Sequence, residues 1–528
     1  MTGREEKMQV SAIPFKVLAL APFKPQEENP WLHKPIHVDK VNVDKILNEL
    51  GLSLDIPLPQ DLCPSGVLRI NIKRLKDFHP DRLIENNPFL NNLLEARRFI
   101  EEARPKGLSN EEIYGRLKVW PNLPIEIRFE PLKPKTSSTS PVDDILKMVA
   151  MPGETSGSSG EVQPLLTKID SLLRQILGHF FSYQKLRDLE SVWEGLRFLI
   201  KQGGRDGEII LKVVPVTFET LEETLNHLMV CLLEDLPSLA ILDLPFDNSP
   251  RSLELLEKVA QFAETLMAPT LCWITSKFFY LDGWQDIKRL PFLPHYLDEP
   301  VFAKWRQLRK VSSARWIATS CNRFLVRYPY GPDNQPSFIH FEESGNLWVS
   351  PVWAIGSLVS KSFIKTGWPT QFTEWQNIRL ENLALTMIEG NKNIPTEANF
   401  SEERMDQFIR TGIMPLVSSL NKDTAFIPAE TTVAGSSLSY QLFLSRITQF
   451  LFWCKDNFEE DLEPLDLEKN LRKAFSLFWE KSGHLTPKNL EISVSKPKPD
   501  QPVIVRIIIE PSRQILPSGE KMELELKW

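Results

Sequence analysis

The sequence predicts a mixed α/β fold of the α+β kind, with helices flanking a central mixed sheet and further strands near both chain ends. Strands and helices alternate between residues 208 and 274, a pattern typical of a mostly parallel, helix-covered sheet. The segment 521–528 alternates strictly between charged and apolar residues, which is the period of a half-buried strand. An apolar run at residues 15–21, between two prolines, predicts another short strand.

The alternating region gives the central sheet in chain order. Short apolar runs predict strands at residues 208–214, 239–244 and 270–274, and apolar residues at helical spacing predict helices at 220–233 and 253–266. Parallel sheets of this kind bind small ligands at the carboxyl ends of their strands. One hypothesis is therefore an α/β enzyme or small-molecule-binding protein that uses the 208–274 sheet.

The strands near the chain ends raise a question of assembly. Residues 503–509 and 521–528, with a turn around 517–519, predict a hairpin, and an isolated hairpin needs a third strand or a packing surface. The terminal strands can pair with each other or be lent to neighbouring copies, and periodicity alone favours the first. The side chains that would form these strands are Phe15, Val17, Leu18, Leu20, Val503, Val505, Ile507, Ile509, Met522, Leu524 and Leu526.

Bulk composition excludes several classes of protein. At 528 residues the chain should hold roughly three domains. A net charge of −7 disfavours a broad nucleic-acid-binding surface. Five scattered cysteines indicate a reducing compartment rather than a disulfide framework or a zinc cluster. The first residues lack the apolar core of a signal peptide, and no apolar run reaches the ~20 residues of a membrane span, so we expect a cytoplasmic protein without membrane insertion.

We expect four regions, at 1–130, 131–164, 165–345 and 346–528, and a change in composition marks the second of them. The second is rich in Pro, Ser, Thr and Gly and is typical of a flexible linker. Within it, a predicted helix at 142–151 places Val142, Ile145, Leu146 and Val149 on one face. This helix could dock on a neighbouring domain or serve as a recognition helix for a partner.

The other predicted helices follow the same spacing rule. One helix is expected to start at Pro80 and continue to about residue 103, another spans 346–366, and two long helices lie at 438–458 and 467–481. A strand is expected at 490–494, before the terminal hairpin.

The sequence lacks the common catalytic motifs. It has no phosphate-binding loop, no dinucleotide-binding GxGxxG, no HExxH and no GxSxG, so we expect no enzyme activity, no cofactor and no metal. His79 lies between Asp77 and Asp81 just before a helix. An acid/base group is conceivable there, but local polar contacts and helix capping explain these residues more simply.

Specific stretches resemble the sheath subunits of type VI secretion systems. Residues 70–83, which contain Asp77-Phe-His-Pro-Asp81, resemble the small subunit of the TssB or VipA family. Residues 191–199, with Trp193-Glu-Gly-Leu196, resemble the large subunit of the TssC or VipB family. Further blocks similar to the large subunit follow in order at 305–309, 323–331, 341–343, 362–363, 367–368, 394–397, 412–416, 421 and 425–426.

The chain therefore resembles the two subunits fused by the linker, with 1–130 as the small-subunit region and 165–345 and 346–528 as parts of the large one. The large-subunit part is shorter than usual, and residues 448–455 depart from the family pattern. The resemblance implies a helical homopolymer that is built on a baseplate around an Hcp-like inner tube and contracts to propel that tube. It also implies strand exchange between copies, which reverses the preference drawn from periodicity.

Two partner sites follow from the resemblance. A ClpV-like AAA+ unfoldase recycles such sheaths, and its nearest candidate site here is Ile145, Leu146 and Val149, or else the helix at 165–177. The inner tube would face one of the two long C-terminal helices, with Lys469, Arg472 and Lys473 as candidates. For these three residues a solvated helix face is the simpler alternative.

Overall fold

The computed structural model describes residues 13–25, 34–103, 105–121, 123–124, 163–202, 208–459, 462–495 and 502–528. These form two compact units. Unit 1 comprises Met1–Ile46, Asp188–Tyr328 and Asn346–Trp528, and unit 2 comprises Leu47–Arg187 and Pro329–Gly345. The units cut across the four ranges expected from the sequence, because the first strand of the chain belongs with the central sheet.

Unit 1 contains a seven-stranded mixed sheet in the order β13-β8-β7-β6-β1-β5-β2. All neighbouring strands are parallel except β2, which runs antiparallel to β5. The prediction of a mostly parallel sheet over 208–274 is therefore confirmed. The strands are β1 (Phe15–Ala21), β2 (Ile36–Val38), β5 (Ile209–Pro215), β6 (Leu239–Phe246), β7 (Thr270–Ile274), β8 (Ile317–Cys321) and β13 (Ile413–Pro415).

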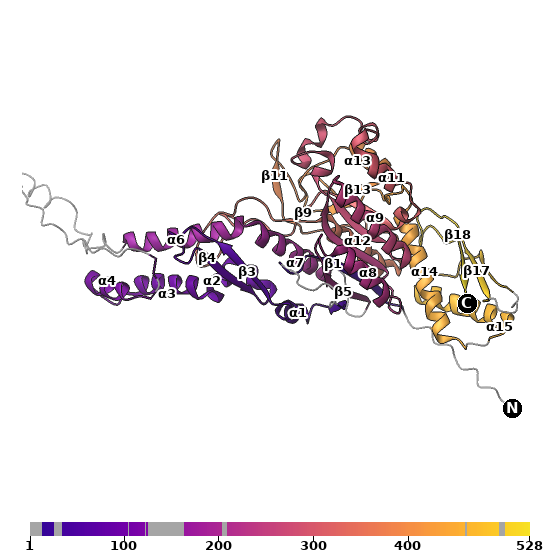
Figure 1. Cartoon of the computed structure of the whole chain (residues 1–528), viewed down its shortest axis with the longest axis horizontal. Helices are drawn as coiled ribbons and strands as arrows, with labels where there is room; N and C mark the ends of the chain where they lie inside the picture. The colour runs from indigo at the N-terminus through magenta and orange to yellow at the C-terminus, as the bar shows by residue number, and fades with distance from the viewer. Residues whose placement is uncertain are drawn as a thin grey trace, which may run out of the picture. The chain divides into compact units, whose positions relative to one another are not determined.

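Strand β1 lies in the interior of this sheet (Figure 1). It pairs with β5 on one side, Phe15 opposite Ile209, and with β6 on the other, Val17 opposite Leu239. The expectation that the first and last strands of the chain pair with each other is wrong, because they belong to different sheets. A nearly continuous apolar run is typical of a parallel strand buried on both faces, and this is how β1 is used.

Helices cover both faces of the central sheet. On one face, Leu242 and Leu244 share a core with helices α8 (Leu221–Cys231) and α9 (Pro250–Thr265). On the other, Ile241 lies under Gly356 of α12 (Pro351–Thr366). Because successive side chains of β6 point to opposite faces, one strand contributes to both layers.

Helix α7 (Gln184–Gln202) also packs in the second layer. Its Leu199 approaches Gly356 of α12, so α7 and α12 meet over the sheet. The predicted helix at 346–366 begins only at Pro351, with Ser350 as its N-cap and proline in the first turn, where a missing N–H costs nothing.

The C-terminal part of unit 1 has its own core. Helices α14 (Leu438–Asn457) and α15 (Pro464–Lys481) pack with the three-stranded sheet β16-β17-β18. Its strands are β16 (Leu490–Val494), β17 (Ile504–Ile509) and β18 (Met522–Lys527). The predicted hairpin is confirmed, and the third strand that it needs is β16.

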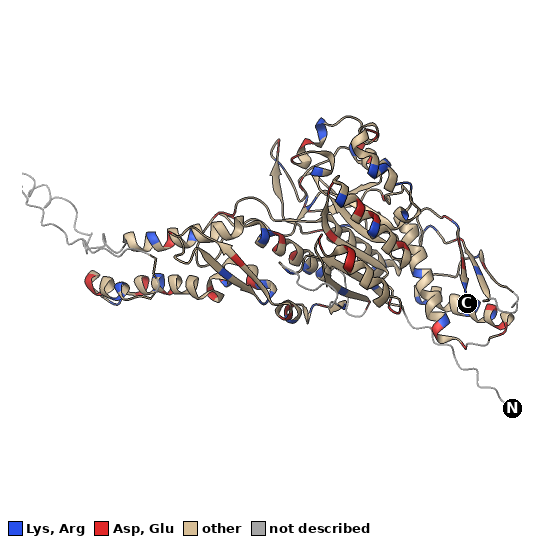
Figure 2. Ribbon diagram, in the orientation of Figure 1, with Lys and Arg blue, Asp and Glu red and all other residues tan. Residues whose placement is uncertain are grey.

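Smaller elements complete unit 1. They are the helices α10 (Leu293–Tyr296), α11 (Ala303–Leu308) and α13 (Glu402–Arg410), and the two-stranded pairs β9 (Phe324–Leu325) with β10 (Trp348–Val349), β11 (Thr386–Ile388) with β12 (Lys392–Ile394), and β14 (Val417–Ser418) with β15 (Ala425–Phe426). Acidic and basic positions are interspersed along helices such as α9 and α15 (Figure 2).

The described part of unit 2 combines an antiparallel hairpin with helices, and both α1 (Val43–Leu50) and α7 span the boundary between the units in the sequence. The hairpin is β3 (Leu52–Pro57) with β4 (Val67–Ile72), and the helices are α2 (Pro80–Asn86), α3 (Pro88–Ala103), α4 (Asn110–Lys118) and α6 (Gln163–Ser182). The single helix expected from Pro80 to about residue 103 is two helices. The backbone before a proline is biased away from helical angles, so α2 ends and Pro88 starts α3.

Polar contacts around α2 explain the motif at 77–81. Asp77 accepts hydrogen bonds from the backbone N–H groups of Lys73 (3.0 Å) and Arg74 (2.9 Å). His79 is the N-cap of α2 and accepts from the N–H of Asp81 (3.3 Å). The local structural role expected for His79 is therefore confirmed.

The remaining sequence expectations for this part of the chain concern the linker at 131–164. The helix expected at 142–151, with Ile145, Leu146 and Val149, lies outside the described residues. Within the described ranges, no helix combines the length and the apolar character that crossing a membrane requires.

Candidate assembly site

The C-terminal sheet offers one side of each outer strand to solvent or to a partner. Just beyond the paired ends of β17 and β18, the N–H of Trp528 donates to the carbonyl of Val503 (2.8 Å). Just after β16, the N–H of Ser495 donates to the carbonyl of Ile504, the first residue of β17 (2.8 Å). Backbone groups alternate in direction along an antiparallel strand. The register then points the backbone of Glu523 and Glu525 outward from β18, and that of Leu490 and Ile492 outward from β16.

The outer edge of β16 is occupied by Arg472 of α15. Its Nη2 donates to the carbonyl of Ile492 (3.0 Å), and its Nη1 lies 3.4 Å from the carbonyl of Leu490. Glu468, one turn earlier, holds the same guanidinium at 3.1 Å. Since an added strand would need those carbonyls, Arg472 blocks extension of the sheet at β16.

The outer edge of β18 is open over most of its length. No strand of the described residues pairs with it, and Lys455 Nζ reaches only the carbonyl of Lys527, at 3.3 Å. Arg506 of β17 forms ion pairs with Glu523 and, at 3.6 Å, with Glu525, which ties the β18 side chains to β17. Within the described residues, β18 is therefore the outer strand of this sheet whose free edge is the less obstructed.

The structure brings together only some of the side chains expected in terminal strands. Val505, Ile507, Ile509 and Met522 are fully buried in the C-terminal core, and Leu524 and Leu526 are partly buried against it. Val503 immediately precedes β17.

The remaining four, Phe15, Val17, Leu18 and Leu20, lie in β1 and are about 1% exposed. Both edges of β1 are hydrogen-bonded within the chain, so β1 presents no open edge to another copy.

The residues expected to face an inner tube lie on α15, and all three are exposed. Arg472 is engaged with Glu468 and β16, as described above. Lys469 and Lys473 flank it on the same helix.

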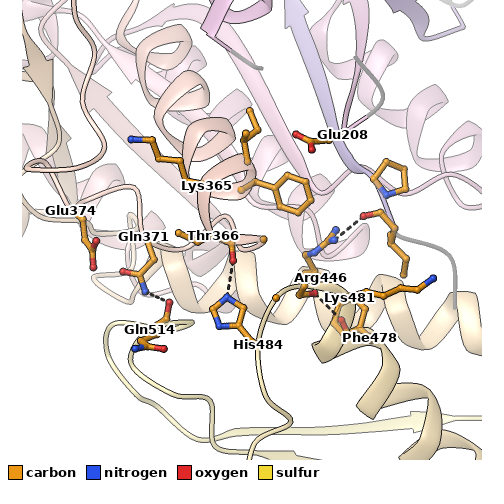
Figure 3. A pocket seen from close by; sticks show the side chains of 17 residues that line it. Glu208, Lys365, Thr366, Gln371, Glu374, Arg446, Phe478, Lys481, His484 and Gln514 are labelled. Atoms are coloured by element: carbon orange, nitrogen blue, oxygen red, sulfur yellow. Dashed lines mark hydrogen bonds between the residues drawn. The ribbon is translucent and has the colours of Figure 1, made fainter. Parts of the chain in front are cut away.

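A cavity of about 750 Å³ lies within unit 1 (Figure 3). The end of α12 and the chain after it, together with α14 and α15, approach the start of β1 there. Its lining includes Ile13, Glu208, Phe363, Glu374, Arg446 and Lys481. Ile13 lies two residues before β1 and Glu208 one residue before β5, so the cavity is at the amino ends of these strands. A ligand site in the 208–274 sheet was expected at the carboxyl ends.

Arg446 of α14 dominates this cavity electrostatically. It is 4% exposed, and its Nη2 donates to the carbonyl of Ile13 (2.7 Å). The guanidinium carbon lies 4.6 Å from the ring centre of Phe363 and 5.7 Å from that of Phe478. Among the described residues, neither Nε nor Nη1 has an acceptor.

Burial lowers the pKa of Arg446 to about 9, so the guanidinium is still charged at neutral pH. No motif marked this residue. Its spacing was the one signal in the sequence. Arg446 lies four residues after Leu442 and four before Phe450, both buried, so helical periodicity places this cation on an apolar helix face.

A second buried ionisable group, Asp243 of β6, has a structural role. Its carboxylate accepts hydrogen bonds from Trp273 Nε1 (2.9 Å) and Trp353 Nε1 (2.6 Å). Burial raises the pKa of Asp243 above the ordinary value. Across the described ranges, no three His, Cys, Asp or Glu side chains gather closely enough to hold a metal ion.

Two protein families match separate parts of the chain. Residues 2–118 match the family described as "Type VI secretion system, VipA, VC_A0107 or Hcp2". Residues 237–434 match the VipB family, described as "EvpB/VC_A0108, tail sheath N-terminal domain". The C-terminal sheet lies beyond both matched ranges.

Individual relatives give a similar result. The chain is 24% identical over 303 residues to the type VI secretion system sheath protein TssC1 of Pseudomonas aeruginosa, a match that covers 51% of this chain and 61% of the relative. The chain thus spans less than two thirds of that relative's length. Among solved structures, it is similar to the sheath tail proteins of Desulfitobacterium hafniense (TM-score 0.32, 9% identity, 58% of this chain and 60% of that chain) and Listeria innocua (TM-score 0.32, 10% identity, 59% and 60%).

Proposed function

Because this chain carries a type VI secretion VipA domain and a VipB tail sheath domain in one polypeptide, we propose that it is a fused subunit of a contractile sheath. Copies of the chain polymerise helically around an inner tube, and contraction of the polymer propels the tube. The observation that carries this proposal is the presence of both domains, in the order small then large, at residues 2–118 and 237–434.

The role is structural rather than enzymatic, and it is carried out in the cytoplasm. The partners are other copies of the chain, an Hcp-like tube, a baseplate and a ClpV-like unfoldase. Lys469, Arg472 and Lys473 are the candidates for the tube contact, and Ile145, Leu146 and Val149 for the unfoldase contact. The exposure of Lys469 and Lys473 supports the first of these assignments.

Copies are joined by a strand added at the outer edge of β18. The support for this is the asymmetry of the C-terminal sheet, in which Arg472 occupies the β16 edge and the described residues leave the β18 edge unpaired. Main-chain hydrogen bonding to an open edge is a general mode of assembly, and a contact that does not close on itself produces a filament.

Strand β1 takes part in strand exchange only if the entire strand leaves its own sheet, because both of its edges are already paired there. Phe15, Val17, Leu18 and Leu20 have no open edge in β1, so β1 of one copy joins another copy by filling that copy's place between β5 and β6.

Negative-stain microscopy of the full chain, with two substitutions at one position, tests the proposal. The wild type should form hollow cylinders. Glu525→Pro removes an outward N–H and leaves the pairing of β18 with β17 intact, because proline is tolerated on edge strands, so this variant should stay folded and monomeric. Glu525→Ala keeps the N–H and should still assemble.

Two results would count against the proposal. A wild type that remains a monodisperse monomer at high concentration contradicts the sheath. Cylinders formed equally well by Glu525→Pro contradict assembly through β18 while leaving the sheath itself in place.

A further inference from the structure

We propose that the cavity around Arg446 is a binding site for a carboxylate group. The site lies entirely within unit 1, at the point where the chain enters β1. It goes beyond the sheath function, because neither matched family range includes Arg446.

Arg446 is a buried cation whose hydrogen-bonding groups are only partly satisfied by the described residues. A buried charge is costly unless it is paired and hydrogen-bonded, and buried polar groups nearly always have partners. Arg446 has one carbonyl acceptor, from Ile13, while the described residues supply none for Nε or Nη1. An acceptor that enters the cavity would complete this set.

The geometry and charge around the guanidinium favour a carboxylate as the missing acceptor. The guanidinium is a planar fork of donors that matches a carboxylate, and the rings of Phe363 and Phe478 lie against it. Figure 3 shows Lys481 and Arg446 on one side of the cavity and Glu374 on the other, with Glu208 above. Two acidic side chains at the rim disfavour a compact group that carries two negative charges, such as phosphate, so a carboxylate, which carries one charge per group, fits the cation better.

The cavity is lined partly by apolar side chains. Ile13, Ile364 and Phe363 contribute apolar surface beside the cation. This suits a carboxylate on a short aliphatic stem, as in a glutamate side chain or a small dicarboxylic acid. Such a group comes either from a free metabolite or from a Glu or Asp side chain of a second copy, and the second source rests on the proposed polymer.

The test measures the melting temperature of the full chain at a concentration below assembly. The probes are sodium glutarate, its neutral analogue glutaramide, and sodium chloride at matched ionic strength. Glutarate should raise the melting temperature in a concentration-dependent way, because a ligand that binds the folded state stabilises it. Glutaramide and chloride should not.

Three variants separate the site from non-specific effects. Arg446→Gln should weaken glutarate binding roughly tenfold or more, the usual consequence of losing a charge-assisted hydrogen bond. Glu208→Gln removes a repelling charge and should strengthen binding, and Lys481→Ala should weaken it. Glu208 and Lys481 are exposed, so these two variants remain informative if Arg446→Gln does not fold.

Microscopy then distinguishes the two sources. If a second copy supplies the carboxylate, glutarate should inhibit cylinder formation; if the ligand is free, cylinders should form normally in its presence. Either outcome supports the site.

Equal effects of glutarate and chloride, or a glutarate effect that is unchanged in Glu208→Gln and Lys481→Ala, would overturn it. Because the melting experiment needs no polymer, a chain that binds glutarate but never forms cylinders would refute the sheath and leave the site standing.

Discussion

Trp353 is the residue through which two helices and the central sheet are joined in unit 1. Its indole N–H is bound by the buried Asp243 of β6, and its ring occupies the space left by the missing side chain of Gly195 on α7. A Cβ built on Gly195 would overlap the indole. Close packing against Trp353 therefore explains why a glycine stands in the Trp193-Glu-Gly-Leu196 stretch, without reference to any related family.

Gly195→Ala should lower the stability of unit 1. Overpacking of this kind costs about 1–3 kcal/mol, and the shift is measurable as a lower urea midpoint. Gly178→Ala on α6 is the matched control, because its Cβ would meet nothing and alanine favours a helix interior by up to about 1 kcal/mol. An unchanged midpoint for Gly195→Ala would show that the indole can move aside freely.

Residues with local partners could be interpreted from the sequence, and residues with distant partners could not. His79 caps the helix that begins one residue later, which a local pattern can reveal. Asp81 instead accepts hydrogen bonds from the backbone of Ser337 (3.0 Å) and Phe338 (3.1 Å). A contact across that separation leaves no periodic signal, so capping alone was expected for Asp81.

At the scale of elements, the same distinction between local and distant information applies. The strand at 270–274 and the one at 490–494 have the expected bounds, because each is a short apolar or alternating run. The hairpin strand β3 was missed, although Leu52, Leu54 and Ile56 alternate as a half-buried strand should. The position of β1 could not be predicted, because periodicity shows that a strand exists and not which strands it joins.

Arg472→Gln should expose the outer edge of β16. The substitution removes hydrogen bonds from a charged donor to the carbonyls of Leu490 and Ile492, at a cost of roughly 0.5–1.5 kcal/mol, and leaves an edge that can pair with another chain. Light scattering should therefore show irregular association. Lys473→Gln, exposed on the same helix, changes charge equally and should not associate; similar scattering from both variants would mean that Arg472 does not protect this edge.

At the scale of the whole molecule, the chain forms two units that each consist of discontinuous segments. In unit 2, the segment Pro329–Gly345 returns to helices that precede it by more than a hundred residues. Arg187 pairs with the buried Glu343 at 2.9 Å, and Tyr330 packs against Phe181 with ring centres 5.1 Å apart. The stability of unit 2 therefore depends on a segment from within the large-subunit part of the sequence.

The two compact units predict two unfolding transitions, of which only the one of unit 2 should respond to Asp81. Asp81→Ala removes the acceptor that holds Ser337 and Phe338 and should destabilise unit 2 by about 1–3 kcal/mol. Calorimetry should show one transition shifted and the other unchanged, while Gly195→Ala shifts the other one. Asp61→Ala, at an exposed position in unit 2, is the control, and a joint shift of both transitions would contradict independent units.

The placement of β1 between β5 and β6 has a consequence for the covalent joining of the two halves. If the halves were separate polypeptides, the large one would lack an interior strand of its sheet, and each subunit would be completed only by a bimolecular encounter that dilution reverses. A covalent connection replaces that encounter with an intramolecular one, which does not weaken on dilution. Fusion therefore lets each copy complete its own central sheet before any neighbour is present, however few copies the cell contains.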